Sequence, residues 1–355
     1  MRIFVCPVSG GAFPIQLGLI SELSLVGVRP DIVMGSSGGN VASYIGLASQ
    51  WKAEDIPKYA AQINSKMFVT SWWPSWLSVF PSWWIGYWKG SIYADGSGSL
   101  EMFKKNFTME SITQTELWTG TLNRQTGKGQ LFSNKNPETS YIKPRNPDLL
   151  SSFWTRDCMP LTYLDGDVER IALVTMASAS IPVLVPEKVI DGNRYVDGGT
   201  LFSSPLTALQ DRVREFAEEG SLHIDYISSF DMQTITTSTY RSLYDNGTQT
   251  IGELVKSLCV QDRLVAIEIL RTHLTNVATL HFAAVEGNQE NLRMIEKVRS
   301  TCQYSVLELY PLENASLDLL TFKPTDIVNL INQAKSKYGL RFWWIGDEAV
   351  NIGVI

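Results

Sequence analysis

The amino-acid sequence predicts an α/β fold with a mainly parallel central sheet and helices on both of its faces. Near the start of the chain, short apolar runs of strand-forming residues alternate with segments of helical spacing, which is the pattern of a parallel sheet covered by helices. Glycine-rich turns follow the first two of these runs. Of the 355 residues, 44% are hydrophobic and 19% are charged, so the chain can bury a substantial core.

The first predicted strand is the apolar run from Ile3 to Val8, and a turn of Ser9, Gly10 and Gly11 follows it. Pro14 then stands where a helix begins. The simplest interpretation of the glycine turn is a tight connection between strand and helix. Parallel strands, however, present their carboxyl ends to one crevice, so the turn is also a candidate oxyanion hole that donates backbone N–H groups to a site on the next strand.

The second predicted strand, Ile32 to Met34, leads into Gly35-Ser36-Ser37-Gly38-Gly39, and a helix-compatible run follows. A Gly-x-Ser-x-Gly motif between a strand and a helix is typical of a nucleophile elbow, with Ser37 as the nucleophile. Such a turn is strained, and the small residues Gly35 and Gly39 tolerate the unusual backbone angles. The motif alone is a weak signal, because turns rich in glycine and serine are common.

The segment between Lys66 and Lys89 contains no charged residue and is rich in aromatic side chains. Pro74 and Pro81 argue against a transmembrane helix, which needs about 20 apolar residues. Tryptophan prefers the membrane interface, where its ring is buried while its N–H stays hydrated. We therefore expect an insertion or lid at about residues 67–90 that contacts lipid through Trp72, Trp73, Trp76, Trp83, Trp84 and Trp88. The alternatives are a tryptophan-rich packed core and a protein–protein surface.

The middle of the chain is predicted to hold a helix, a hairpin, a loop and a further strand. Leu100 to Phe107 favours a helix, and Glu116 to Asn123 a strand whose partner in a hairpin is Gln130 to Phe132. Three prolines predict a loop over residues 134–148. The apolar run from Arg170 to Thr175 predicts another strand.

A second hairpin is predicted around the turn Asp191-Gly192, and its second strand ends in Asp197-Gly198-Gly199. This motif is either an ordinary turn or the position of a site residue. The elements expected after about residue 210 are a strand from Leu222 to Ser229, long helices over residues 250–300, a strand from Tyr304 to Tyr310, a helix from Pro324 that Gly339 ends, and an apolar tail from Phe342 that docks on the body. Because no linker is evident, we predict one domain over residues 1–355.

Ser37 requires a general base, because a serine hydroxyl is a weak nucleophile. One option is a Ser-His-Asp triad with Asp197, but α/β-hydrolases place several strands before the elbow, whereas one predicted strand precedes Ser37 here. The three histidines, moreover, do not lie in glycine-rich or loop-like contexts; they are His223, His273 and His281. The other option is a direct Ser–Asp dyad with Asp197 as the base.

At this point the sequence resembles the patatin-like phospholipases, well over about residues 1–210 and loosely beyond. Four segments occur in the family's order: the glycine turn at Ser9-Gly10-Gly11, the elbow around Ser37, the small-residue stretch Ala177-Ser-Ala-Ser-Ile-Pro, and Val196-Asp197-Gly198-Gly199. The segment from Thr121 to Lys128 is also similar to the family's hairpin.

The resemblance implies a patatin-like three-layer architecture and a phospholipase A or esterase activity on a phospholipid or other acyl lipid, with no metal and no organic cofactor. Carried over, Ser37 attacks the ester carbonyl, Asp197 accepts its proton, and the Gly10 and Gly11 amides hold the oxyanion. The family's glycine loop usually has a third glycine and a nearby basic residue, whereas no basic residue lies between this loop and Arg29. That departure motivates an alternative, a catalytically weak lipid- or protein-binding module on the same fold.

Composition and charge exclude other classes of function. The net charge of −6 and the lack of a basic run argue against a nucleic-acid partner. Four widely spaced cysteines indicate neither a disulfide framework nor a metal site. The first apolar run is too short for a signal peptide, so we expect a cytoplasmic protein with a peripheral association with membranes, and any protein activator is unknown. A serine peptidase is a weaker third class, because the tryptophan-rich segment suits acyl chains better than peptides.

Overall fold

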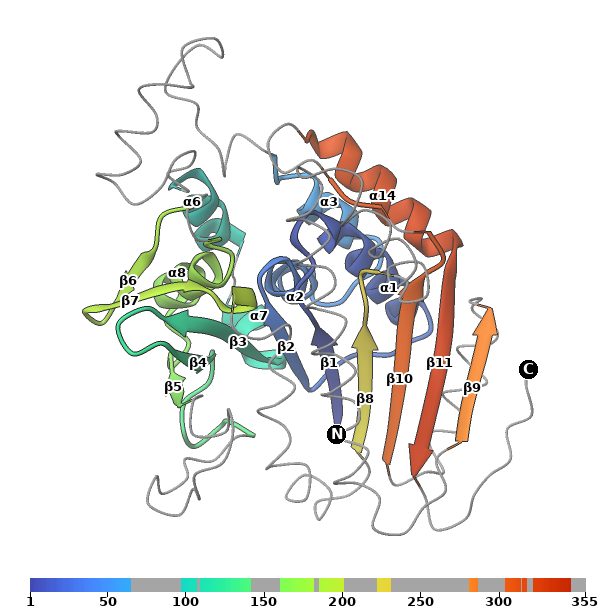
Figure 1. The fold of residues 1–355 in the computed structure, drawn as a ribbon, viewed down its shortest axis with the longest axis horizontal. Helices are drawn as coiled ribbons and strands as arrows, with labels where there is room; N and C mark the ends of the chain where they lie inside the picture. The colour runs from blue at the N-terminus through green and yellow to red at the C-terminus, as the bar shows by residue number, and fades with distance from the viewer. Residues whose placement is uncertain are drawn as a thin grey trace, which may run out of the picture.

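The computed structural model describes residues 1–64, 97–106, 109–141, 160–181, 185–200, 222–230, 281–286, 304–313, 315–317 and 322–345. Eleven strands in these ranges form one sheet (Figure 1). They are β1 (Arg2–Cys6), β2 (Ile32–Ser36), β3 (Glu116–Asn123), β4 (Lys128–Ser133), β5 (Leu161–Tyr163), β6 (Lys188–Ile190), β7 (Asn193–Asp197), β8 (Leu222–Ile227), β9 (His281–Glu286), β10 (Tyr304–Pro311) and β11 (Tyr338–Ile345).

The strands lie in the order β5-β4-β3-β2-β1-β8-β10-β11-β9, and the hairpin of β6 and β7 pairs with β3. The centre of the sheet is parallel, because β3, β2, β1, β8 and β10 run in one direction. Antiparallel neighbours extend both sides: β4 and β7 on β3, and β11 on β10. The predicted α/β class with a mainly parallel sheet is confirmed.

The helices of the described ranges are α1 (Phe13–Leu25), α2 (Gly38–Ala48), α3 (Ile56–Ala60), α6 (Ser97–Asn106), α7 (Met109–Gln114), α8 (Val168–Ser178) and α14 (Pro324–Ser336), with short 3-10 turns η1 (Gly10–Ala12) and η4 (Gly198–Thr200). Figure 1 shows α1, α2, α3 and α14 grouped beside the parallel strands, while α6 and α8 lie near β3 and the β6–β7 hairpin. As the sequence predicts, α1 begins next to Pro14.

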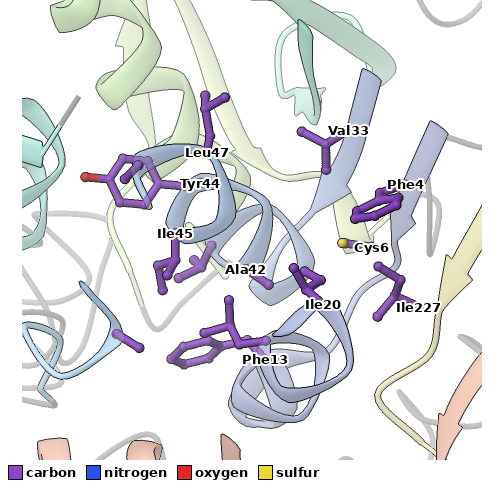
Figure 2. Packing of buried hydrophobic residues seen from close by; sticks show 14 of the residues in the cluster. Phe4, Cys6, Phe13, Ile20, Val33, Ala42, Tyr44, Ile45, Leu47 and Ile227 are labelled. Atoms are coloured by element: carbon purple, nitrogen blue, oxygen red, sulfur yellow. The ribbon is translucent and has the colours of Figure 1, made fainter. Parts of the chain in front are cut away.

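The hydrophobic core fixes the first two strands to the first two helices. Figure 2 shows buried side chains from these elements gathered in one cluster, including Phe4, Val33, Ile20 and Ala42, all almost fully buried. Burial of one such larger side chain contributes roughly 1.5–3 kcal/mol. On its other side α2 is held by α6, because the Tyr44 ring meets Phe103 edge to face at 4.4 Å. The helix that follows the elbow is therefore packed on two sides.

The prediction of a strand over residues 170–175 is wrong, because this segment lies inside helix α8. The side chain of Asp167 caps the helix by accepting a hydrogen bond from the Arg170 amide at 3.1 Å. Ile171, Val174 and Thr175 are all buried, and their spacing of three and four residues matches one face of a helix. A short apolar run cannot by itself distinguish a buried strand from a buried helix.

The predictions for the last part of the chain need two further corrections. The helix that begins at Pro324 ends at Ser336, and Gly339 belongs to strand β11. Gly339 permits a close approach rather than a helix stop, since a Cβ atom there would lie 2.3 Å from the ring of Tyr310 on β10. Residues 281–286 form strand β9 where long helices are predicted. The tail joins the sheet as far as Ile345, as its apolar character indicates.

Several other predictions lie outside the described residues. They include the tryptophan-rich insertion or lid at about 67–90, the remaining helices over 250–300, and residues 142–148 of the predicted loop over 134–148. The single domain over 1–355 with a helical part after about 210 also stays a prediction. Within the described ranges, no helix combines the length and the apolar character needed to cross a bilayer.

Candidate active site

Ser37 occupies a strained turn between the end of β2 and the start of α2. Its backbone angles are φ 56° and ψ −131°, a left-handed conformation that a residue with a side chain rarely adopts. Such a conformation costs about 1–3 kcal/mol and persists only where the surroundings impose it. The carbonyl oxygen of Ser37 accepts the amides of Asn40 and Val41, which starts the helix directly after the turn. This geometry is that of a nucleophile elbow.

The two glycines predicted to flank the elbow allow close contacts on both sides of it. A Cβ atom on Gly39 would lie 2.2 Å from the carbonyl oxygens of Cys6 and Pro7, at the end of β1. On Gly35, a Cβ atom would lie 2.6 Å from the Cα atom of Asn40. Both distances are far shorter than a van der Waals contact, so only glycine fits without a backbone shift. The first turn of α2 consequently lies directly against β1.

Asp197 is the hydrogen-bond partner of Ser37. The Ser37 Oγ donates to Asp197 Oδ2 at 2.7 Å, although the two residues are 160 positions apart. Asp197 is the last residue of β7, and it pairs with Thr121 on β3, the strand next to β2. The second carboxylate oxygen, Oδ1, accepts the Gly199 amide at 2.7 Å. The sheet thus brings together the two residues that the sequence singled out.

Burial makes the Asp197 carboxyl a weaker acid than an ordinary aspartate. Only 4% of Ser37 and 3% of Asp197 are exposed to solvent. Loss of hydration raises the pKa of Asp197 to about 7, while the hydrogen bonds from Ser37 and the Gly199 amide act in the opposite direction. A carboxylate with a pKa near the working pH is a stronger base than an ordinary aspartate, and it still exists largely ionised above pH 7.

The end of α8 holds the backbones of both residues. Ser178 Oγ accepts the Ser37 amide at 3.1 Å and donates to the carbonyl oxygen of Gly120 at 2.7 Å. Two residues further on, the Ser180 carbonyl oxygen accepts the Asp197 amide at 3.0 Å. Sequence reasoning noted this small-residue stretch but assigned no role to Ser178. The signal was too general, because short runs of alanine and serine also occur as packing segments.

The glycine turn after β1 lies against the residue that follows Ser37. A Cβ atom on Gly38 would lie 2.5 Å from the Gly10 carbonyl oxygen, 2.6 Å from Ser9 Oγ and 2.8 Å from the Gly10 amide nitrogen. Gly10 itself has a φ of 50°, which explains the need for glycine there. Gly11 is fixed from the other side, because its carbonyl oxygen accepts the Leu317 amide at 2.9 Å. Of the two predicted oxyanion donors, Gly10 therefore adjoins the elbow directly.

The amide of Gly38 is a candidate donor that sequence reasoning missed. It belongs to the residue after the nucleophile and to the first residue of α2, where a helix offers backbone N–H groups to an anion. In elbows of this type, the amide after the nucleophile commonly contributes to the oxyanion hole. Its position directly after Ser37 was the available signal.

The structure does not bring a histidine of the described residues to Ser37. His223 on β8 pairs with Arg2 at the start of β1, whereas Gly35 of the elbow pairs with Cys6 at its end. These two places lie at opposite ends of the parallel strands, because β1 starts at Arg2 and ends at Cys6. His281 lies on β9, the last strand in the sheet order, and His273 is outside the described residues.

Two further predictions concern metal and membrane contacts. In the part of the chain that the structure describes, no group of three His, Cys, Asp or Glu side chains is arranged to hold a metal ion. The tryptophans predicted to meet lipid lie outside the described residues; they are Trp72, Trp73, Trp76, Trp83, Trp84 and Trp88. The contact of these tryptophans with lipid therefore stays a prediction.

Comparison with known proteins gives a match to a family and a limited likeness to solved structures. The family model described as patatin-like phospholipase matches residues 9–209, which is more than half of the chain and includes Ser37 and Asp197. No curated protein matches. VipD from Legionella pneumophila is a similar solved structure, with a TM-score of 0.34 and 13% sequence identity. That likeness covers 94% of this chain and 66% of the VipD chain, so this chain spans less than two thirds of VipD.

Proposed function

Because the chain belongs to the patatin-like phospholipase family, we propose that it is a lipid acyl hydrolase, a phospholipase A or esterase that uses a Ser37–Asp197 dyad. The observation that carries the proposal is the 2.7 Å hydrogen bond from Ser37 Oγ to Asp197 Oδ2. It joins a serine on a strained elbow to a buried carboxyl whose pKa burial raises to about 7. A nucleophile in reach of a base with a matched pKa is the arrangement that acyl transfer requires.

In the acylation step, Ser37 Oγ attacks the carbonyl carbon of the ester and Asp197 accepts the hydroxyl proton. The carbonyl oxygen becomes an oxyanion, which the amides of Gly10, Gly11 and Gly38 stabilise. Each such donor contributes about 3–4 kcal/mol to lowering the barrier. When the tetrahedral intermediate collapses, the carbon–oxygen bond to the alcohol breaks, and Asp197 returns the proton to the leaving alcohol.

In the deacylation step, water replaces the alcohol and Asp197 acts as base again. Water attacks the acyl carbon while its proton passes to the carboxylate, and the second intermediate releases the fatty acid and restores the Ser37 hydroxyl. All of these steps use groups of the chain itself. The strain at Ser37 favours catalysis, because it presents Oγ clear of the backbone at the N-terminus of α2.

Family membership supports a class of substrate, and the sequence supports a site of action. We propose that the substrate is a phospholipid or another acyl lipid, taken from a membrane surface that the charge-free tryptophan-rich segment contacts. On this proposal the protein acts in the cytoplasm and associates peripherally with membranes. Residues 1–355 form a single acyl-hydrolase domain.

Hydrolysis of p-nitrophenyl esters of increasing chain length tests the proposal directly. Wild type and Ser37→Ala are compared in parallel, and a fluorophosphonate probe is added to both. We expect turnover and covalent labelling in wild type and neither in the variant. Phosphatidylcholine vesicles then report whether fatty acid is released from a phospholipid. Equal hydrolysis by the two proteins would contradict the assignment of Ser37.

A second candidate function is a lipid- or protein-binding module with little catalysis. The observation that favours it is the glycine loop, which has two glycines and no basic residue before Arg29. The fluorophosphonate separates the two candidates. A binding module leaves Ser37 unlabelled, whereas a hydrolase is labelled even if its natural lipid is absent from the assay.

A further inference from the structure

Three buried polar atoms near the elbow have no hydrogen-bond partner within the described part of the chain. They are Ser9 Oγ, Ser36 Oγ and Asn40 Nδ2. A buried donor without a partner costs about 1–3 kcal/mol, so such atoms are rare and call for an explanation. A bound substrate that supplies the missing acceptor is one explanation, provided that the atom adjoins the reacting groups.

The positions of the three atoms differ. Ser36 Oγ lies against Gly198, 2.8 Å from where a Cβ atom on that glycine would stand, on the side of η4 and β3. Asn40 lies against Gly35, and its Oδ1 atom accepts a hydrogen bond from Thr119 on β3. Both residues therefore adjoin β3, the strand next to β2, which leads into the elbow.

Ser9 is placed differently, on the loop that faces the elbow from β1. It directly precedes Gly10, whose amide is one of the proposed oxyanion donors. Its Oγ atom lies 2.6 Å from the position that a Cβ atom on Gly38 would take, and Ser9 is 4% exposed. The unpartnered hydroxyl, the backbone of Gly10 with its amide nitrogen and carbonyl oxygen, and the residue after Ser37 thus meet at one place.

We propose that the Ser9 hydroxyl is a further oxyanion donor, an inference that rests on the proposed function. In the free protein the O–H group has no acceptor, and the carbonyl oxygen of the bound ester supplies one. As that oxygen gains negative charge in the tetrahedral intermediate, the hydrogen bond becomes charge-assisted and stronger. The proton stays on Ser9 throughout. A side-chain donor here adds to the backbone donors of a loop with two glycines.

The test is Ser9→Ala, which removes the hydroxyl and leaves the rest of the side chain. We expect kcat on a p-nitrophenyl ester to fall about 100-fold, while KM changes less than about 3-fold, because the bond strengthens in the transition state. The melting temperature should not fall, since the hydroxyl makes no hydrogen bond in the free protein. Ser9→Gly, which suits a glycine-rich loop, should show the same loss of kcat.

Ser21→Ala is the matched control. Ser21 is also a buried serine, on helix α1 directly after the loop, but its hydroxyl donates to the Leu17 carbonyl oxygen within the helix. This variant should keep the wild-type kcat. Ser9 variants with wild-type kcat, beside a wild type whose turnover depends on Ser37, would overturn the role of Ser9 alone. A wild type without Ser37-dependent turnover would overturn this inference and the proposed function together.

Discussion

The nucleophile and the base of the proposed dyad come from regions that are built in different ways. Ser37 and the glycine loop lie within the first 40 residues, on turns that follow the adjacent parallel strands β1 and β2. Asp197 lies 160 positions after Ser37, at the end of a hairpin that pairs with β3. The first region is local in sequence, whereas the second depends on contacts between distant segments.

This difference determines how each region holds its residue. The elbow takes its strained shape because the glycines around Ser37 permit close contact with β1 and with the first turn of α2. The base is held by strand pairing, by the Ser180 carbonyl oxygen and by the Gly199 amide. Changes at the glycines around Ser37 should therefore disturb the fold, while conservative changes on the base side should mainly disturb activity.

The largest expected effect on the base side is that of Asp197→Asn. The amide has the shape of the carboxyl but cannot accept the proton of Ser37, so kcat should fall about 10³–10⁴-fold. The fold should persist, because a neutral group at this buried position needs no hydration. Ester hydrolysis and a melting curve measure the two quantities. The control is Asp191→Asn, at the exposed turn of the same hairpin, and an Asp197→Asn enzyme of full activity would point back to a different base.

The pH dependence is the next largest effect, and it acts in opposite directions on activity and stability. Because the ionised form of Asp197 is the base, kcat/KM should rise about tenfold per pH unit up to about pH 7 and then level off. A carboxyl whose pKa is raised by folding stabilises the folded state while it is protonated in the fold, so this contribution declines from about pH 4 to about pH 7.

Asp197→Asn provides the control for that pH dependence. The variant should lose the part of the stability change that wild type shows between about pH 4 and pH 7, as measured by melting temperature across the pH range. If wild type and variant lost stability in parallel over this window, Asp197 would not be the group that titrates.

A smaller effect is expected for Ser178→Ala. Ser178 connects the two regions by its hydrogen bonds. Its hydroxyl accepts the Ser37 amide and donates to Gly120, so its loss should loosen the elbow and reduce kcat about 10-fold with KM nearly unchanged. Thr175→Val, a buried change on the same helix α8, is the control. The rate of fluorophosphonate labelling should fall with kcat if Ser178 positions Ser37. An unchanged labelling rate with a lowered melting temperature would indicate a purely structural role.

The smallest effect on the chemistry is expected from the tryptophans outside both regions. Replacement of Trp83, Trp84 and Trp88 with serine should weaken binding to phosphatidylcholine vesicles several-fold, because tryptophan side chains partition to the membrane interface. Hydrolysis of a soluble ester should stay within about 2-fold of wild type. Co-sedimentation with vesicles and ester hydrolysis give the two readouts. Equal loss of both, with a lower melting temperature, would favour a packed core instead.

Local signals along the chain were sufficient to predict several elements of this protein. The strand, the elbow around Ser37 and the helix after it could be predicted, because glycine spacing and short-range periodicity encode them within a few residues. The hairpin that ends at Asp197 was predicted for the same reason. The strand prediction over residues 170–175 was wrong, because the apolar pattern of this short run fits a strand and a buried helix equally. The cap at Asp167 favours the helix.

Which residues meet in the site depends on the packing of distant segments. The pairing of β7 with β3 brings Asp197 to Ser37, and the register of β8 places His223 at the opposite end of the parallel strands. Ser178 and Ser9 gained their proposed roles in the same way, from contacts with the elbow. Neither serine stands in a pattern that sequence alone could distinguish, because hydrogen bonding between distant segments depends on the packed sheet and not on neighbours along the chain.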